Sequence, residues 1–306
     1  METHAAFGFI LGTGRCGSTL IHDLVARHPD VGFLSNVDDR LRRPVLGGRW
    51  NNPVYRRVPP PLTQKGRPRF APSEGYRILG ARVSPMLVAP CRDLVAADAA
   101  PWVVERFAGF FRGVAAAQGR PVFLHKFTGW PRAGFIEAAL PGSRFIHVVR
   151  DGRAVAASLV RMPWWDGFGG PERWSFGPLS DADRAAWEAA GRSFAVLAGL
   201  EWKILMQAFE AARAIVAAER WFELRYEDFL SDPWGSLERI LDFLGLPWTR
   251  LFERQVRRYQ FQLERVEAYR RDLAPAELRA LDACLGEHLA RLGYLVQGAS
   301  VTGVSA

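Results

Sequence analysis

Eight residues near the start of the chain carry the clearest sign of chemistry. The stretch Gly12-Thr13-Gly14-Arg15-Cys16-Gly17-Ser18-Thr19 follows the apolar run "FGFIL". It has the frame of a phosphate-binding loop, G-x-x-x-x-G-K-[ST], except that Ser18 stands where the frame has lysine. The backbone N–H groups of such a loop, with the dipole of the helix behind them, hold a phosphate group. We therefore expect an anion site here that works without the usual lysine.

Basic residues also follow a second apolar run. The run "FIHVV" ends at Arg150, and Ser158 lies in the helix expected to follow. In an open parallel sheet, ligands bind at the carboxyl ends of the strands, beside the next helices. Arg150 and Ser158 are therefore candidates for holding a second phosphate. Two phosphate sites on neighbouring strands suit a nucleotide phosphorylated at both ends, such as a 3′,5′-bisphosphate.

Strands and helices that alternate along the chain must position these residues. Short apolar runs predict strands in "FGFIL", "PVFLHKF", "SRFIHVV" and "RWFELRY". Helical spacing predicts helices between them, including one long helix from Asp181 to about Glu219, or two with a break near Gly199. The alternation predicts an α/β fold with a P-loop-like central parallel sheet, flanked by helices on both faces.

Composition points to a globular protein. The chain has 306 residues, of which 49% are hydrophobic, enough for a substantial core. We expect a single domain over residues 1–298 and a tail at 299–306. The three cysteines, Cys16, Cys91 and Cys284, lack metal-ligand spacing, which argues against a zinc site and a disulfide framework. No run is apolar enough to span a membrane and the start lacks signal-peptide features, so we expect a soluble, cytoplasmic protein.

Positive charge is concentrated at about residues 40–72. Nine Lys and Arg lie between Arg40 and Phe70 with no Asp or Glu among them, whereas the whole chain has a net charge of +8. The prolines and glycines of this insertion predict a loop throughout. Three interpretations stay open: a solvated loop, one wall of a site for anionic ligands, and a nucleic-acid surface.

Taken together, the motifs resemble those of sulfotransferases. "FGFILGTGRCGSTL" resembles their 5′-phosphosulfate loop, and "FIHVVRDGRAVAAS" resembles their 3′-phosphate motif, with Arg150 and Ser158 in the positions that grip the 3′-phosphate. "LRYEDFLSDP" resembles the later segment whose tyrosine, here Tyr226, helps to hold the nucleotide. "FLHKF" resembles the strand with a lysine near the transferring group, here Lys126. The arginine in the loop, Arg15, makes the chain resemble the branch with arginine at this position, which includes tyrosylprotein sulfotransferases and many bacterial members.

The resemblance implies transfer of a sulfuryl group from 3′-phosphoadenylyl sulfate to a hydroxyl or amine by in-line displacement. Arg15, Lys126 and the N–H groups of the loop are then placed to stabilise charge on the leaving phosphate, and no metal is required. The acceptor would be a small molecule, a glycan or a lipid, and no nucleic-acid partner is expected. The identity of the acceptor and the oligomeric state stay open.

The group that takes the proton of the acceptor also stays open. Arginine-loop relatives have a catalytic glutamate about twenty residues beyond the loop arginine, where this chain reads Ser35-Asn36-Val37-Asp38-Asp39. Asp38 or Asp39 would replace it after a small shift in register. Glu74, in "PSEGY", and His125 are other candidates. The Lys-Thr-His base of cytosolic members is absent, since Phe127 and Thr128 follow Lys126.

Two other functions are compatible with the sequence alone. A kinase or NTPase of the P-loop class needs a lysine at Ser18 and an acidic residue at a strand end to hold Mg²⁺, for which Asp151 is the candidate. A non-catalytic nucleotide- or nucleic-acid-binding module would show no turnover, and binding to DNA or RNA would depend steeply on salt.

Overall fold

The computed structural model of the chain describes residues 5–59 and 71–294. Its contacts divide the chain into two compact units. Unit 1 comprises Met1–Val149 and Ala208–Leu263, and unit 2 comprises Arg150–Gln207 and Glu264–Ala306. The single domain expected over residues 1–298 stays a prediction, and the tail expected at 299–306 lies outside the described residues.

Unit 1 is built on a parallel sheet. Within the described ranges its strands are β1 Ala6–Gly12, β2 Val31–Gly32, β3 Val122–Thr128, β4 Arg144–Val149 and β5 Trp221–Arg225. They lie in the order β2-β3-β1-β4-β5, and each neighbouring pair is parallel. β1 is therefore the central strand, and the glycine loop that follows it has β3 and β4 on either side. The predicted α/β fold with a central parallel sheet is confirmed.

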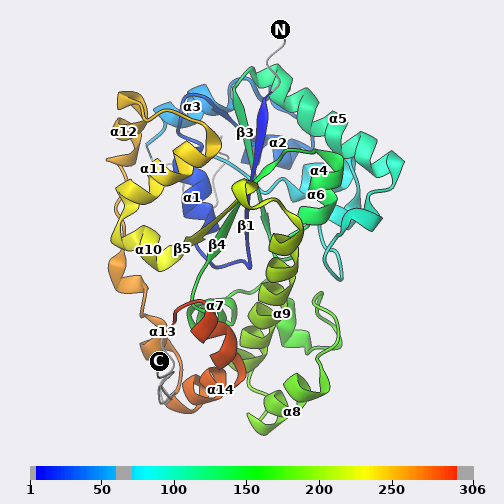
Figure 1. Cartoon of the computed structure of the whole chain (residues 1–306), viewed down its shortest axis with the longest axis vertical. Coiled ribbons are helices and arrows are strands. Elements are labelled where there is room, and N and C mark those ends of the chain that lie inside the picture. Colours follow the sequence, from blue (N-terminus) through cyan, green and yellow to red (C-terminus); the bar gives the residue numbers. More distant parts are fainter. Residues whose placement is uncertain (1–4, 60–70, 295–306) are drawn as a thin grey trace, which may run out of the picture. The chain divides into compact units, whose positions relative to one another are not determined.

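Helices cover this sheet. Those whose residues lie wholly in unit 1 are α1 Ser18–Val25, α2 Asn36–Leu41, α3 Asn51–Arg57, α4 Tyr76–Arg82, α5 Pro101–Gln118, α6 Ala133–Ala139, α10 Tyr226–Ser231, α11 Pro233–Leu244 and α12 Arg250–Val256. In Figure 1, α1 and α11 lie on one side of the strands and α5 and α6 on the other. Because both faces are covered, β1, β3 and β4 consist mostly of buried residues.

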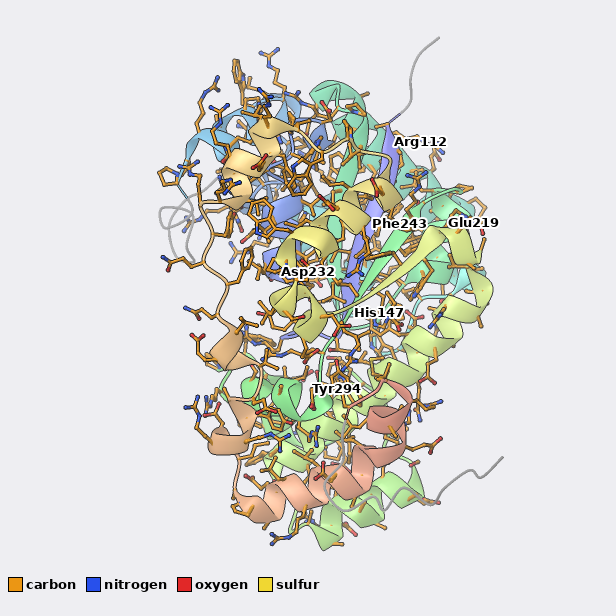
Figure 2. The ribbon with its side chains drawn as sticks, turned by 60° about the vertical axis from the view of Figure 1, so that its left-hand side comes forward. Arg112, His147, Glu219, Asp232, Phe243 and Tyr294 are labelled. Atoms are coloured by element: carbon orange, nitrogen blue, oxygen red, sulfur yellow. The ribbon has the colours of Figure 1, made fainter. Side chains whose placement is uncertain are left out.

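Aromatic rings pack around Phe9, in the central strand of the sheet. Phe9 of β1 lies 5.8 Å from Phe111 and 6.1 Å from both Phe127 and Phe145, measured between ring centroids. α11 packs on β5 through Phe243, whose ring centroid is 5.4 Å from that of Phe222. Asp232 and Phe243, near the two ends of α11, are labelled in Figure 2.

The basic insertion is not a loop throughout, so that prediction was wrong. α3 lies within it, and Asn51 and Asn52 on this helix are buried. Asn51 Nδ2 donates a 3.0 Å hydrogen bond to the carbonyl of Phe33, and Asn52 Nδ2 donates to the carbonyl of Ala26 at 2.9 Å. These amides stabilise the helix by bonding to residues far away in the sequence, which composition does not reveal. Residues 60–70 of the insertion lie outside the described residues.

Unit 2 is helical in its described part. Helices whose residues lie wholly in it are α7 Gly152–Leu159, α8 Asp181–Ala189, α13 Tyr269–Asp272 and α14 Pro275–Arg291. α9 Phe194–Ile215 begins in unit 2 and ends in unit 1. The break in the long helix predicted from Asp181 lies between α8 and α9, where Gly191 and Arg192 have positive φ angles, and not near Gly199.

A buried carboxyl group makes the stability of the protein depend on pH. Glu201 on α9 accepts a 2.6 Å hydrogen bond from Nε1 of Trp165. Burial raises the pKa of Glu201 from 4.5 to about 8, although the hydrogen bond from Trp165 opposes this shift. Between these two pH values the folded state keeps a proton that the unfolded state has lost. Stability from this group is therefore fully present below about pH 4.5 and is lost as the pH rises through about 8.

Glu201→Gln tests this pH dependence. Glutamine keeps an acceptor for Trp165 but does not ionise, so the free energy of unfolding of the variant should fall less between about pH 5 and pH 9 than that of the wild type. Denaturant unfolding at several pH values measures this slope. The control is Glu188→Gln, because Glu188 is an exposed carboxylate of unit 2. Equal slopes for wild type and Glu201→Gln would show that Glu201 is ionised in the folded state.

Candidate active site

The glycine loop makes a tight turn between β1 and α1. Gly14, Arg15 and Gly17 have φ angles of 82°, 54° and 92°, and Gly17 is the N-cap of α1. In turns of this kind, successive N–H groups face one concave side, a geometry that binds anions. Arg15 is half-buried within this turn. The loop therefore has the local shape expected of a phosphate site.

Two positions of the loop require glycine because other side chains approach them closely. A Cβ atom on Gly17 would clash with the ring of Tyr226, and one on Gly12 would clash with Sγ of Cys16. Tyr226 is the first residue of α10 and follows β5 directly. Tyr226 and the glycine loop, which are far apart in the sequence, are thus brought together within unit 1.

Lys126 links β3 to the glycine loop and to a carboxylate. Its Nζ donates a 2.7 Å hydrogen bond to Oγ1 of Thr19 and forms a 2.7 Å ion pair with Oε1 of Glu74. An ammonium group has three donors, so these two contacts leave a third for an oxygen of a ligand. The lysine side chain is 5% exposed and that of Glu74 is 29% exposed. The cation is therefore held in a fixed position, while the carboxylate is accessible to solvent.

Backbone pairing with the segment that follows β2 brings Glu74 to Lys126. Ser35 and Pro72 form an antiparallel bridge, the N–H of Asn36 bonds to the carbonyl of Ala71, and the N–H of Ser73 bonds to the carbonyl of Leu34. The segment at 71–73 thus runs beside residues 34–36, which are close in sequence to the expected position of the glutamate of arginine-loop relatives. A second segment of the chain supplies a carboxylate beside that position.

Asp38 and Asp39 are both engaged in local structure. Asp38 is fully buried and accepts hydrogen bonds from Ser35, Val45 and Asn51, and it completes the capping box of α2. Asp39 Oδ1 accepts hydrogen bonds from the N–H groups of residues 77 and 78, in the first turn of α4. Neither carboxylate has a hydrogen bond or ion pair with Lys126 in the part of the chain that the structure describes.

His125 points into the aromatic core. Its ring centroid lies 5.1 Å from that of Phe111 and 4.7 Å from that of Phe127. Burial, and to a smaller extent the charge of Lys126, lowers the pKa of His125 to about 3. The imidazole is therefore neutral at physiological pH, and with so low a pKa it is a weak base.

Arg150 and Ser158 lie in unit 2. Arg150 is half-buried and precedes Asp151, the N-cap of α7, whose side chain accepts a hydrogen bond from the N–H of Arg153. Ser158 lies near the end of the same helix and is also half-buried. Arg153 is buried and pairs with Asp151 and Asp282, so this second arginine of the motif has a structural role.

Three residues around Glu74 and Lys126 were not found from the sequence. The hydroxyl group of Tyr76 bonds to Thr128, and the guanidinium of Arg132 bonds to the carbonyl of Thr128. The only signal for Tyr76 and Thr128 is position: Tyr76 is two residues after Glu74, and Thr128 is two residues after Lys126. Arg132 has no such signal.

Residues 5–59 and 71–294 contain neither a metal-binding cluster nor a membrane-spanning helix. No cluster of three or more His, Cys, Asp and Glu side chains placed to hold a metal ion occurs there. No helix in these ranges combines the length and the apolar character needed to cross a bilayer.

Solved structures of bacterial sulfotransferases resemble this fold. Sulfotransferase STF9 from Mycobacterium avium has a TM-score of 0.56 at 16% identity, covering 96% of this chain and 79% of that one. The sulfotransferase domain of the Synechococcus PCC 7002 olefin synthase has a TM-score of 0.50 at 16% identity, covering 92% and 96%. At these identities the likeness shows the fold.

Sequence comparison identifies the family. Omega-hydroxy-beta-dihydromenaquinone-9 sulfotransferase Stf3 from Mycobacterium tuberculosis and Mycobacterium bovis is 25% identical over 191 residues, which cover 60% of this chain and 44% of the relative. The match thus spans less than half the length of these relatives. Residues 9–250 match the model of a protein family described as "Sulfotransferase family". The chain therefore belongs to the sulfotransferase family.

Proposed function

We propose that the protein transfers a sulfuryl group from 3′-phosphoadenylyl sulfate to a hydroxyl acceptor. The observation that carries this proposal is the contact of Lys126 with both Thr19 of the glycine loop and Glu74. It joins a buried cation, an anion-binding loop and an accessible carboxylate at the carboxyl ends of β1 and β3, where ligands bind in such sheets. Family membership supports the same reaction.

The residues have complementary parts in this proposal. The donor supplies an activated sulfuryl group, whose bond to phosphate breaks as the bond to the acceptor oxygen forms. Glu74 takes the proton of the acceptor, because its carboxylate is reachable from solvent. Arg15, Lys126 and the N–H groups of Gly12–Thr19 stabilise the negative charge that builds on the leaving phosphate. Asp38 and Asp39 hold α2 and α4 in place.

The nucleotide half of the donor is assigned from the motifs. Arg150 and Ser158 hold the 3′-phosphate, as the resemblance implies, and Tyr226 supports the nucleotide beside the loop. The packing of the Tyr226 ring on Gly17 supports this assignment, because it places the ring against the backbone that holds the 5′ group. The leaving group is then adenosine 3′,5′-bisphosphate.

For the acceptor, we propose an alcohol on an apolar, lipid-like molecule. The mycobacterial relatives are named for an omega-hydroxy-beta-dihydromenaquinone, and this is the support for that class. Transfer of ³⁵S from labelled donor to a panel of long-chain alcohols, isoprenoid alcohols, phenols, sugars and amines tests it. Turnover confined to sugars or amines would contradict the lipid-like alcohol while leaving the reaction type intact.

We expect adenosine 3′,5′-bisphosphate to bind much more tightly than ADP or AMP. ADP and AMP lack the 3′-phosphate that Arg150 and Ser158 are proposed to hold. Isothermal titration calorimetry in the presence of EDTA measures the three dissociation constants, and Arg150→Gln should remove most of the preference. Equal affinities, or binding that depends on Mg²⁺, would support a P-loop kinase or NTPase in place of the proposed reaction.

A further inference from the structure

A second pair of residues lies beside the Glu74–Lys126 ion pair. The hydroxyl of Tyr76 donates a 3.2 Å hydrogen bond to the carbonyl of Thr128, accepts one of 3.1 Å from its N–H, and lies 3.1 Å from its Oγ1. Burial, and then the charge of Glu74, raises the pKa of Tyr76. The phenol therefore keeps its proton at physiological pH and is able both to donate and to accept.

The spacing of the two pairs is matched. Glu74 and Tyr76 are two residues apart, and so are Lys126 and Thr128. In a strand such as β3, side chains two residues apart project from the same face. Glu74 and Tyr76 flank Gly75, the left-handed N-cap of α4. The contact of Tyr76 with Thr128 holds this turn beside β3 with Glu74 at Lys126. A shift by one residue would remove the carboxylate from the ammonium group.

Arg132 bonds to the same carbonyl oxygen of Thr128 as Tyr76 does. It is 2% exposed, and its guanidinium donates to the carbonyl of Thr128 at 3.3 Å and to that of Trp130. Its Nε has no hydrogen-bond partner within the described ranges. Burial of a charge has a large desolvation cost, which hydrogen bonds to carbonyl groups offset only in part. Burial lowers the pKa of Arg132, and the interactions of Arg132 with Tyr76, Asp93 and Glu74 oppose this shift.

We propose that Tyr76 and Arg132 are positioning residues that hold Glu74 against Lys126 through Thr128. The inference rests on the proposed role of Glu74 as the base. Tyr76→Phe removes the hydroxyl contacts and should lower kcat by about 10- to 100-fold, the usual effect of a displaced catalytic group. The KM for the donor should change little, because the loop and Arg150 are untouched. Arg132→Met should behave alike, and Arg132→Lys should restore part of the lost kcat.

Coupling to Glu74 is the decisive measurement. If Tyr76 acts through Glu74, Tyr76→Phe should have little further effect on kcat in a Glu74→Gln background, because residues that act as a unit are not additive. The matched control is Tyr55→Phe, which removes the hydroxyl of another buried tyrosine in unit 1 and should leave kcat unchanged. Equal losses from Tyr76→Phe in both backgrounds would overturn the inference. A fully active Glu74→Gln enzyme would overturn the proposed base instead.

A spectroscopic readout separates positioning from general loss of structure. The chain has only three lysines, Lys65, Lys126 and Lys203, so ¹⁵N-lysine labelling gives few side-chain signals. Lys126→Arg assigns the Nζ signal of interest. Glu74→Gln and Tyr76→Phe should both shift this signal, and Tyr55→Phe should not. An unchanged Lys126 signal in Tyr76→Phe would show that the ion pair does not depend on Tyr76.

Discussion

Arg15→Met should lower kcat by about 10²- to 10³-fold, the typical loss when one preorganised donor to a developing negative charge is removed. The KM for the donor should change little, because the contact strengthens as charge builds on the leaving phosphate. Methionine matches the aliphatic part of the arginine side chain, and any L residue at position 15 meets the same left-handed backbone, with a φ of 54°. Steady-state kinetics with saturating acceptor measure both constants.

Arg150 supplies the matched comparison. Arg150→Met should raise the donor KM and leave kcat closer to that of the wild type, because a 3′-phosphate contact is equally strong before and during transfer. The opposite behaviour of two arginine variants excludes a general loss of folding as the cause. If both substitutions raise KM alone, Arg15 anchors the donor and has no special part in the chemical step.

The parts of the site predicted from sequence are those whose geometry is local. The loop from Gly12 to Thr19 follows a strand and precedes a helix, so its motif also specifies its structure. Lys126 was assigned from the resemblance of "FLHKF" to the lysine-bearing strand of the family, and the local sequence also predicts a strand there. Tyr226 was assigned from resemblance, and its packing on Gly17 adds a physical reason for both residues.

The choice of base could not be made from sequence because it depends on pairing between distant segments. Glu74 reaches Lys126 only because residues 71–73 run beside residues 34–36, and no local pattern encodes that pairing. One local signal did exist for Asp38. The stretch Ser35-Asn36-Val37-Asp38 has a serine three residues before an acidic residue, close to the form of a capping box, and the structure uses Asp38 in this way.

In the basic insertion, too, contacts between distant residues determine a part of the structure that the local sequence does not predict. Its prolines and glycines predict a loop, whereas α3 is held by the buried amides of Asn51 and Asn52, which bond to carbonyl groups of Phe33 and Ala26. Asparagine favours turns when its partners are local. Here its partners are remote, so the tertiary contact decides the local structure.

The proposed role of Glu74 as the base predicts the second large effect on kcat. Glu74→Gln should lower kcat by about 10²- to 10⁴-fold, because glutamine is similar in size but does not accept the proton of the acceptor. The donor KM should stay within a small factor, since the amide oxygen can still accept a hydrogen bond from Lys126. Asp39→Asn is the matched control: it removes another carboxylate that is not fully buried, one that bonds to the first turn of α4, and should leave most of kcat.

Acceptors of graded acidity show whether the lost group is a base. An acceptor of low pKa gives up its proton readily, so the loss caused by Glu74→Gln should shrink along a series of acceptors of falling pKa, whereas a loss through misplaced structure would stay constant. In the same way, formate added to Glu74→Ala should restore part of the rate by supplying a carboxylate. A constant loss across the series, together with a large loss in Asp39→Asn, would move the role of base to Asp39 and leave Glu74 as the residue that orients Lys126.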